Sequence, residues 1–284
     1  MDQNFFMRRL TFVLLLLIAS LPLLHAQTLD RALSADAPTI LSFAADGSPA
    51  LPASSIAAVN FTAPATLPRM APELALSTYQ QRSARQAQML AGYKAATVIR
   101  AELPDNAQRG EFELERNYTA PHTLTFKSLR FQGDGFVKTN VIARLLQSEV
   151  DHVQKDDPAA TALRPENYKF SYKGVIQDGD RTLHVYQVKP RKKRVGLFKG
   201  HIFLDVGSGS LVRVEGRVAK SPSLFVKKID FYQEYADIDG FTLPVHMHSE
   251  AKAALIGRTV VDITNRDYQP IPALAVSARL SASH

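Results

Sequence analysis

The sequence predicts an α+β fold in which a long antiparallel meander curls into a half-open β-barrel, covered by about two helices. Most of the chain after residue 94 alternates apolar and polar side chains with a period of two, which is typical of strands. Short connections such as QDGD, GSGS and DIDG join these runs, and such connections require antiparallel pairing. Helical spacing occurs in only two segments, so about two helices are available to cover one face of a sheet wide enough to curl.

Residues 1–26 are predicted to be a secretory signal peptide. Arg8 and Arg9 precede an apolar run from Leu10 to Leu24, and Ala26 is the small residue at the expected cut. The alternative is a membrane anchor, but the run is shorter than the roughly 20 residues that a spanning helix needs. We therefore expect an exported, periplasmic or secreted protein whose mature chain begins at Gln27.

The remaining chain divides into three parts. Residues 27–76 are rich in Ala, Pro and Ser and keep no regular period, which predicts a flexible leader; its SSIAAVNF stretch is compatible with a short strand or a docking segment. Residues 77–270 form the predicted half-barrel domain, and residues 271–284 form a C-terminal tail.

The elements of the domain follow in a simple order. The first helix is expected to start at Ser77 or Thr78 as its cap and to end at Gly92. Three strands, a second helix over 136–153 and seven further strands come next. The expected strands are 94–103, 110–118, 122–132, 167–176, 181–189, 200–206, 211–218, 224–235, 241–249 and 257–264.

Alternation along the strands assigns one apolar face to the concave side of the sheet. A curled sheet under helices encloses either a filled core or a ligand cavity. Arg116 has the parity of its apolar neighbours and would point inward, whereas a bulge would turn it outward. The apolar residues expected on this face are Phe112, Leu114, Phe126, Ile202, Leu204, Val212, Val214, Ile229, Phe231, Leu243, Val245 and Met247.

Positive charge is concentrated in one region. The net charge is +7, but residues 189–228 hold eleven Lys or Arg against Asp205 and Glu215, so the rest of the mature chain carries about −3. The run Arg191, Lys192, Lys193 and Arg194 is expected at a hairpin tip. It is either a solvated tip or a contact for anionic lipid or an acidic partner; nucleic acid is not expected, because no aromatic residues interleave the run.

No pattern typical of catalysis is present. Cysteine is absent, which removes thiol catalysis and thiolate metal sites, and we find no nucleophile elbow, paired-histidine zinc helix or phosphate loop. His246, His248 and Glu250 share one strand face, but further zinc ligands are not evident. The sequence therefore predicts a protein without a metal or cofactor that is not an enzyme; an enzyme with an unrecognised site is the remaining alternative.

Four motifs occur in a fixed order: Lys189-Pro190, Gly200 to Asp205, Val212 to Gly216 and Lys220 to Ser223. In this order they resemble the lipoprotein-localisation superfamily, and especially its uncharacterised outer-membrane lipoprotein-sorting proteins, over residues 77–268. The resemblance implies a half-open barrel whose apolar hollow holds acyl chains in some members and serves protein partners in others. The function it implies is a non-enzymatic carrier for a lipid, a lipoprotein's acyl chain or another apolar ligand. The alternative is an envelope sensor or regulator that binds a protein partner.

Overall fold

The computed structural model describes residues 69–155, 158–221, 226–253 and 257–273. The expected signal peptide and residues 27–68 of the leader lie outside these ranges. The helical elements are α2 (Pro72–Met89), η1 (Pro104–Asn106), α3 (Gly135–Val137), η2 (Lys138–Ile142), α4 (Ala143–Lys155) and η3 (Pro158–Ala160). The strands are β1 (Leu90–Leu103), β2 (Gln108–Thr119), β3 (Thr123–Gly133), β4 (Tyr168–Asp178), β5 (Arg181–Pro190), β6 (Phe198–Asp205), β7 (Leu211–Val218), β8 (Val226–Ile238), β9 (Phe241–Ala253) and β10 (Gly257–Pro272).

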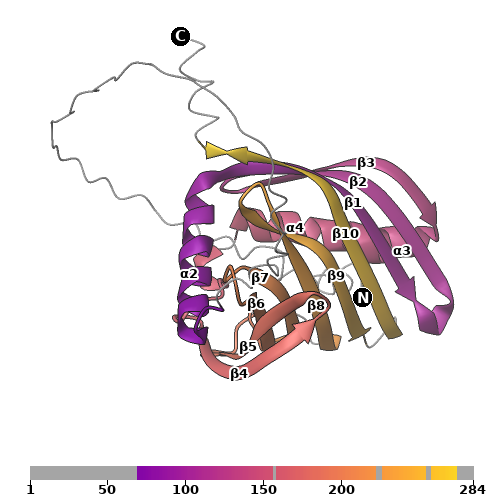
Figure 1. Cartoon of the computed structure of the whole chain (residues 1–284). Helices are drawn as coiled ribbons and strands as arrows, with labels where there is room; N and C mark the ends of the chain where they lie inside the picture. Colours follow the sequence, from indigo (N-terminus) through magenta and orange to yellow (C-terminus); the bar gives the residue numbers. More distant parts are fainter. Residues whose placement is uncertain (1–68, 156–157, 222–225, 254–256, 274–284) are drawn as a thin grey trace, which may run out of the picture. The chain divides into compact units, whose positions relative to one another are not determined.

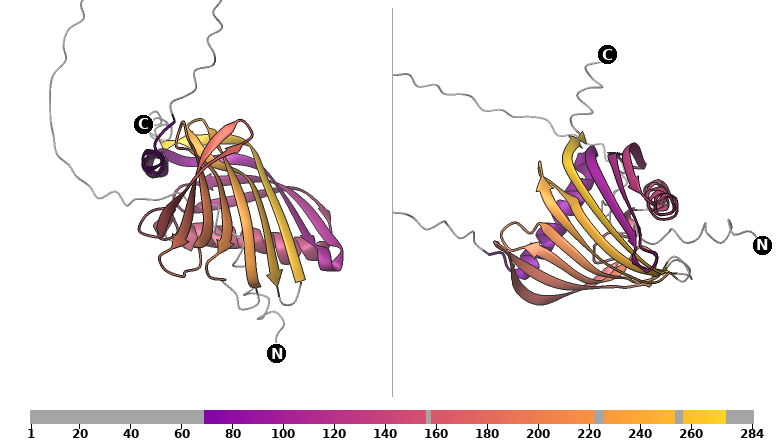
Figure 2. Two further views of the ribbon diagram at one scale, coloured as in Figure 1. Left: turned by 60° about the horizontal axis from the view of Figure 1, so that its bottom comes forward. Right: turned by 90° about the vertical axis from the view of Figure 1, so that its right-hand side faces the viewer.

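The strands form a ten-stranded antiparallel sheet in the order β3-β2-β1-β10-β9-β8-β7-β6-β5-β4 (Figure 1). Pairing of β1 with β10, which sets Ile99 opposite Ile263, joins the first three strands to the last seven. Strands β3 and β4 are the two edges, so the sheet curves without closing (Figure 2). This arrangement confirms the predicted half-open meander. In the described part of the chain, no helix is long and apolar enough to span a membrane.

Helix α2 differs from the prediction at both ends. It begins at Pro72, with extended Ala71 before it, and not at Ser77 or Thr78. Proline suits the first helical position because its fixed φ is already helical and its missing N–H would have no partner there. Residues 72–76, expected in the leader, therefore belong to the helix. At the other end β1 begins directly at Leu90, so Gly92 lies in the strand.

A bulge corrects the prediction for Val212. Phe203 pairs with Arg213 and Leu204 pairs with Leu211, so β7 carries one extra residue at this point. Val212 consequently packs with Leu183, Val185 and Phe203 in a small cluster on the outer face of the sheet. It does not share the inner face with Val214, because the extra residue changes the parity of the strand.

Two of the four sequence motifs contain a glycine that the close approach of neighbouring strands requires. Gly200 of β6 lies directly opposite Gly216 of β7. A Cβ atom added at Gly200 would lie 1.9 Å from the carbonyl oxygen of Glu215 and 2.6 Å from the Cα of Gly216. The two strands therefore approach closely only because neither position carries a side chain.

We expect Gly200→Ala to destabilise the domain by about 1–3 kcal/mol, because the strands must separate to admit the methyl group. Urea unfolding of the wild type and the variant measures the change. Gly135→Ala is the matched control, since a Cβ at Gly135 meets no atom within 4 Å. Equal unfolding midpoints for Gly200→Ala and the wild type would show that the glycine pair is not a packing requirement.

Candidate functional site: the inner face of the sheet

The inner face of the sheet is apolar both under α2 and under the helical segment 135–155. Under α2, a cluster joins Tyr79 of the helix to inward residues of β4–β8. The predicted residues Ile202, Leu204, Val214 and Phe231 all belong to it. These side chains are buried, and Leu204 is 0% exposed.

The second half of the face is covered by the helical segment 135–155 (Figure 2). Val137, Ile142 and Leu145 of this segment join inward residues of β1, β2, β9 and β10 in one buried cluster. The predicted residues Leu114 and Met247 are members, and Phe112 and Phe126 pack against it half-buried. A third cluster contains Leu243, and Ile229 is buried. Val245 is half-buried and belongs to none of these three clusters, because β9 carries it as an extra residue: Glu234 pairs with His246 and Tyr235 pairs with Pro244.

Arg116 points inward from β2 into this apolar surface. Its Nη1 lies 2.7 Å from Oε2 of Glu149 on α4, and both side chains are 1% exposed. The guanidinium also stands over the ring of Phe126, 5.1 Å from the ring centroid. The ion pair therefore connects the sheet to the helix that covers it.

Burial and charge shift the pKa values of Arg116 and Glu149 in opposite directions. Burial raises the pKa of Glu149, and the positive charge of Arg116 lowers it by less. Burial disfavours the Arg116 cation and lowers its pKa, but the charge and hydrogen bond of Glu149, together with Tyr93 and Tyr268, raise the pKa of Arg116 above its ordinary value. Arg116 is therefore a permanent cation, while Glu149 holds a proton more readily than an exposed glutamate.

The pair retains unused hydrogen-bonding capacity. Nε and Nη2 of Arg116 and Oε1 of Glu149 have no hydrogen-bond partner among the described residues. The inward side chains of Gln233, Ser249 and Thr259, on β8, β9 and β10, are also buried, and each has an oxygen atom without a partner in the described chain. Such groups can hydrogen-bond a polar group that enters the inner face.

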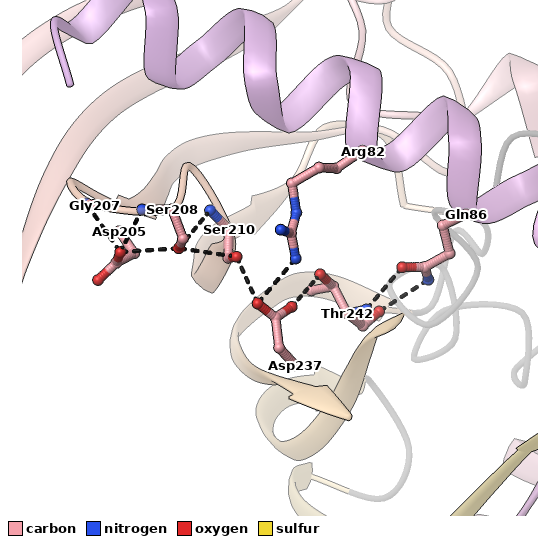
Figure 3. Close-up of polar contacts among 8 residues, drawn as sticks. All are labelled: Arg82, Gln86, Asp205, Gly207, Ser208, Ser210, Asp237 and Thr242. Atoms are coloured by element: carbon pink, nitrogen blue, oxygen red, sulfur yellow. Dashed lines mark hydrogen bonds and ion pairs between the residues drawn. The ribbon is translucent and has the colours of Figure 1, made fainter. Parts of the chain in front are cut away.

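Polar contacts attach α2 to the rims of the sheet. At its start, Tyr186 donates a hydrogen bond to the carbonyl oxygen of Pro72 at 2.5 Å. Further along, Gln86 accepts from the backbone N–H of Thr242 and donates to its carbonyl oxygen (Figure 3). Arg82 pairs with Asp237 at 2.9 Å, so the helix is attached at both ends.

Asp237 is the centre of the second attachment. Its carboxylate accepts hydrogen bonds from Ser210 and Thr242, each at 2.6 Å, and pairs with Arg82 (Figure 3). Burial alone would raise the pKa of Asp237, but these hydrogen bonds and the charge of Arg82 lower it below its ordinary value. The contribution of Asp237 to stability is therefore present at neutral pH and is lost as the pH falls through this lowered pKa.

Two clefts lie beside this attachment. One is lined by side chains of α2 and by Leu211, Tyr235 and Thr242. The other lies between the end of α2, including Met89, and the β8–β9 turn with Phe241. Both open along the edge of α2, where that helix meets the sheet.

The histidines of β9 lie on the outer face. His248 Nδ1 is 2.8 Å from Oδ1 of Asp262, and His246 Nε2 is 3.5 Å from the same oxygen. Glu250 accepts a hydrogen bond from Arg258 at 3.0 Å. Across residues 69–155, 158–221, 226–253 and 257–273, no group of three or more His, Asp or Glu is arranged to hold a metal ion.

The basic run lies where the hairpin was predicted. Residues 191–194 form an exposed loop between β5 and β6. Nε of Arg191 donates a hydrogen bond to the carbonyl oxygen of Pro165 at 2.5 Å, which fixes the base of the loop. The three cations that follow project from the rim of the sheet without an ion pair to a described acidic residue.

The polar residues of the inner face that sequence reasoning missed include Glu149, Gln233, Ser249 and Thr259. The last three have the strand parity of buried apolar neighbours such as Phe231, Met247 and Val261, so alternation could have found them. Glu149 follows Leu145 by four residues on the covered face of its helix, which is an unusual place for a carboxylate.

A family model matches residues 161–266, and its description is a family of unknown function (DUF5686). No curated protein matches the chain. Among solved structures, the chain is similar to a LolA superfamily protein from Nitrosomonas europaea, with 11% identity, 69% of this chain and 92% of that chain covered, and a TM-score of 0.35. A DUF1329 family protein from Desulfovibrio piger has 12% identity, 70% and 92% coverage and a TM-score of 0.38. The MucA/MucB complex of Pseudomonas aeruginosa has 11% identity, 69% and 98% coverage and a TM-score of 0.24.

Proposed function

We propose that this protein is an exported, non-enzymatic binding or carrier protein of the periplasm, and that it holds a lipid, an acyl chain of a lipoprotein or another apolar ligand on the inner face of its sheet. The observation that supports this proposal is the apolar inner face of an open sheet. Two helices cover this face, and one of them is attached through polar contacts at its ends. The ligand-binding residues proposed are the inner-face residues named above, without Val212 and Val245.

The polar groups within this face support a ligand with a polar end. Arg116 supplies N–H donors, and Ser249 and Thr259 supply hydroxyl groups, in surroundings that exclude water. A carboxyl, ester or amide group would use this capacity, whereas a pure hydrocarbon would leave it unused. An acylated molecule therefore suits the face better than an alkane does.

The test is the lipid content of the protein as purified. Solvent extraction followed by mass spectrometry is expected to show a co-purifying acylated molecule in stoichiometric amount. A fluorescent fatty acid should also bind the delipidated protein and lose its signal when unlabelled fatty acid is added. Absence of both extracted lipid and fatty-acid uptake would contradict the proposal.

An envelope sensor or regulator that binds a protein partner is the second candidate. One observation favours it: the edge strand β4 exposes Tyr172, Val175 and Ile176, which are 42%, 44% and 37% exposed. An exposed apolar edge strand is a site where a partner can add a strand. The test asks whether the lipid-free protein forms a complex with one envelope protein. Formation of this complex by the wild type, and its loss in the variant Val175→Lys, Ile176→Lys, would favour this candidate.

A further inference from the structure

On the outer face of β1–β3, charged residues lie opposite residues of the other sign. Glu113 of β2 pairs across the sheet with Arg130 of β3, and Glu115 pairs with Lys127. Arg100 of β1 lies opposite Glu111 and forms an ion pair with it at 2.6 Å. Such cross-strand pairs stabilise a sheet, whereas like charges directly opposite each other destabilise it.

The outer face of β4–β7 departs from this rule. Lys169 of β4 lies directly opposite Lys189 of β5, and Lys199 of β6 lies directly opposite Arg217 of β7. Val188 pairs with Gly200, and this register sets Lys189 beside Lys199. These four residues form a line across the sheet, the basic row.

Little acidic charge compensates the basic row. Arg217, at one end, pairs with Asp230 of β8 at 2.6 Å. The three lysines are exposed and form no ion pair with a described acidic residue. With strands about 4.8 Å apart, the row extends over roughly 14 Å.

The row continues into the basic loop, residues 191–194. Lys189 is followed directly by Pro190 and this loop, so the row and the loop lie at the same end of β5. All four loop residues are exposed. Neither described cleft beside α2 is lined by these residues, so the cations cover an open surface and not a pocket for a small anion.

We propose that the basic row and the basic loop form a docking surface for an anionic phospholipid membrane. This surface is separate from the proposed inner-face ligand site and goes beyond that function. A membrane suits the observations because its mobile headgroups can match cations on a flat strand surface and on a loop at once. The like charges that weaken the sheet pairing are then neutralised by the partner.

The experiment measures co-sedimentation of the full chain with vesicles of phosphatidylglycerol and phosphatidylcholine. The test variant changes Lys169, Lys189, Lys192, Lys193 and Lys199 to Gln and keeps Arg191, whose side chain fixes the loop. Each cation near an anionic surface contributes about fivefold to binding, so the variant should bind at least about 100-fold more weakly. Binding of the wild type should also fall between low and moderate salt.

The matched control neutralises five exposed cations elsewhere: Lys94, Arg109, Lys127, Arg130 and Arg266 to Gln. It makes the same change in net charge and is expected to retain most of the vesicle binding. Equal loss in both variants, or no binding of the wild type to anionic vesicles at low salt, would overturn the proposal.

Two further measurements complete the test. Fatty-acid uptake by the test variant should equal that of the wild type, so failure of the docking surface is distinguishable from failure of the ligand site. Binding of the wild type to polyglutamate, without binding to the vesicles, would assign the surface to acidic polypeptides and overturn the membrane proposal. Circular dichroism is the check that both variants are folded.

Discussion

Replacing Arg116 by leucine is expected to destabilise the domain by about 3–5 kcal/mol, because it leaves Glu149 buried without its cationic partner. Replacing both residues by leucine should return the stability to within about 1–2 kcal/mol of the wild type, since apolar side chains of similar size replace buried ion pairs without large loss. Urea unfolding of the two single variants and the double variant measures the coupling between the residues.

The loss of stability caused by Arg116→Leu should also depend on pH. Burial raises the pKa of Glu149, and without Arg116 nothing in the pair opposes that shift. The folded variant then binds a proton that the unfolded chain releases, so its stability falls as the pH rises above the ordinary glutamate pKa. A loss of the same size at pH 5 and pH 8 would contradict this account.

The control for the pair is the exposed ion pair between Arg100 and Glu111, 2.6 Å apart. Arg100→Leu is expected to cost less than about 1 kcal/mol, because exposed pairs contribute little. If the double leucine variant is stable but no longer takes up a fluorescent fatty acid, the buried pair serves the ligand and not the fold.

Carboxylates placed on the inner face should separate the proposed ligand-binding residues that the fold also requires from those that it does not require. Leu204→Glu and Val214→Glu are expected to unfold the domain, because both positions are almost completely buried and an unpaired carboxylate there costs several kcal/mol. Phe112→Glu and Phe126→Glu should remain folded, because both side chains are half-buried, and should lose most fatty-acid uptake. Circular dichroism and uptake titrations measure the two effects.

Leu129→Glu is the matched control, because Leu129 on β3 is 59% exposed. This variant should keep both its fold and its uptake. Unchanged uptake in folded Phe112→Glu and Phe126→Glu proteins would remove these residues from the ligand site. Unfolding of all four inner-face variants would show that the whole face is core.

The fold class and the strands could be predicted from the sequence because alternation is a local property. Val214 and Phe231 have the parity expected from their neighbours, and the structure buries both on the inner face. The cap of α2 was predicted six or seven residues late, at Ser77 or Thr78 and not at Ala71, because a hydroxyl cap is a stronger sequence signal than the proline that begins the helix. Val212 was placed on the wrong face because one bulge residue reverses parity and has no sequence signal of its own.

The sequence by itself determined that this protein is an antiparallel meander with short turns and one apolar face. It also determined that the positive charge is concentrated in residues 189–228. Only the tertiary structure decided that β1 pairs with β10, that Glu149 reaches Arg116, and that Lys169, Lys189 and Lys199 stand side by side. The first properties follow from neighbours along the chain. The others join residues on different elements, and the free energy of packing and charge pairing across the sheet selects those contacts.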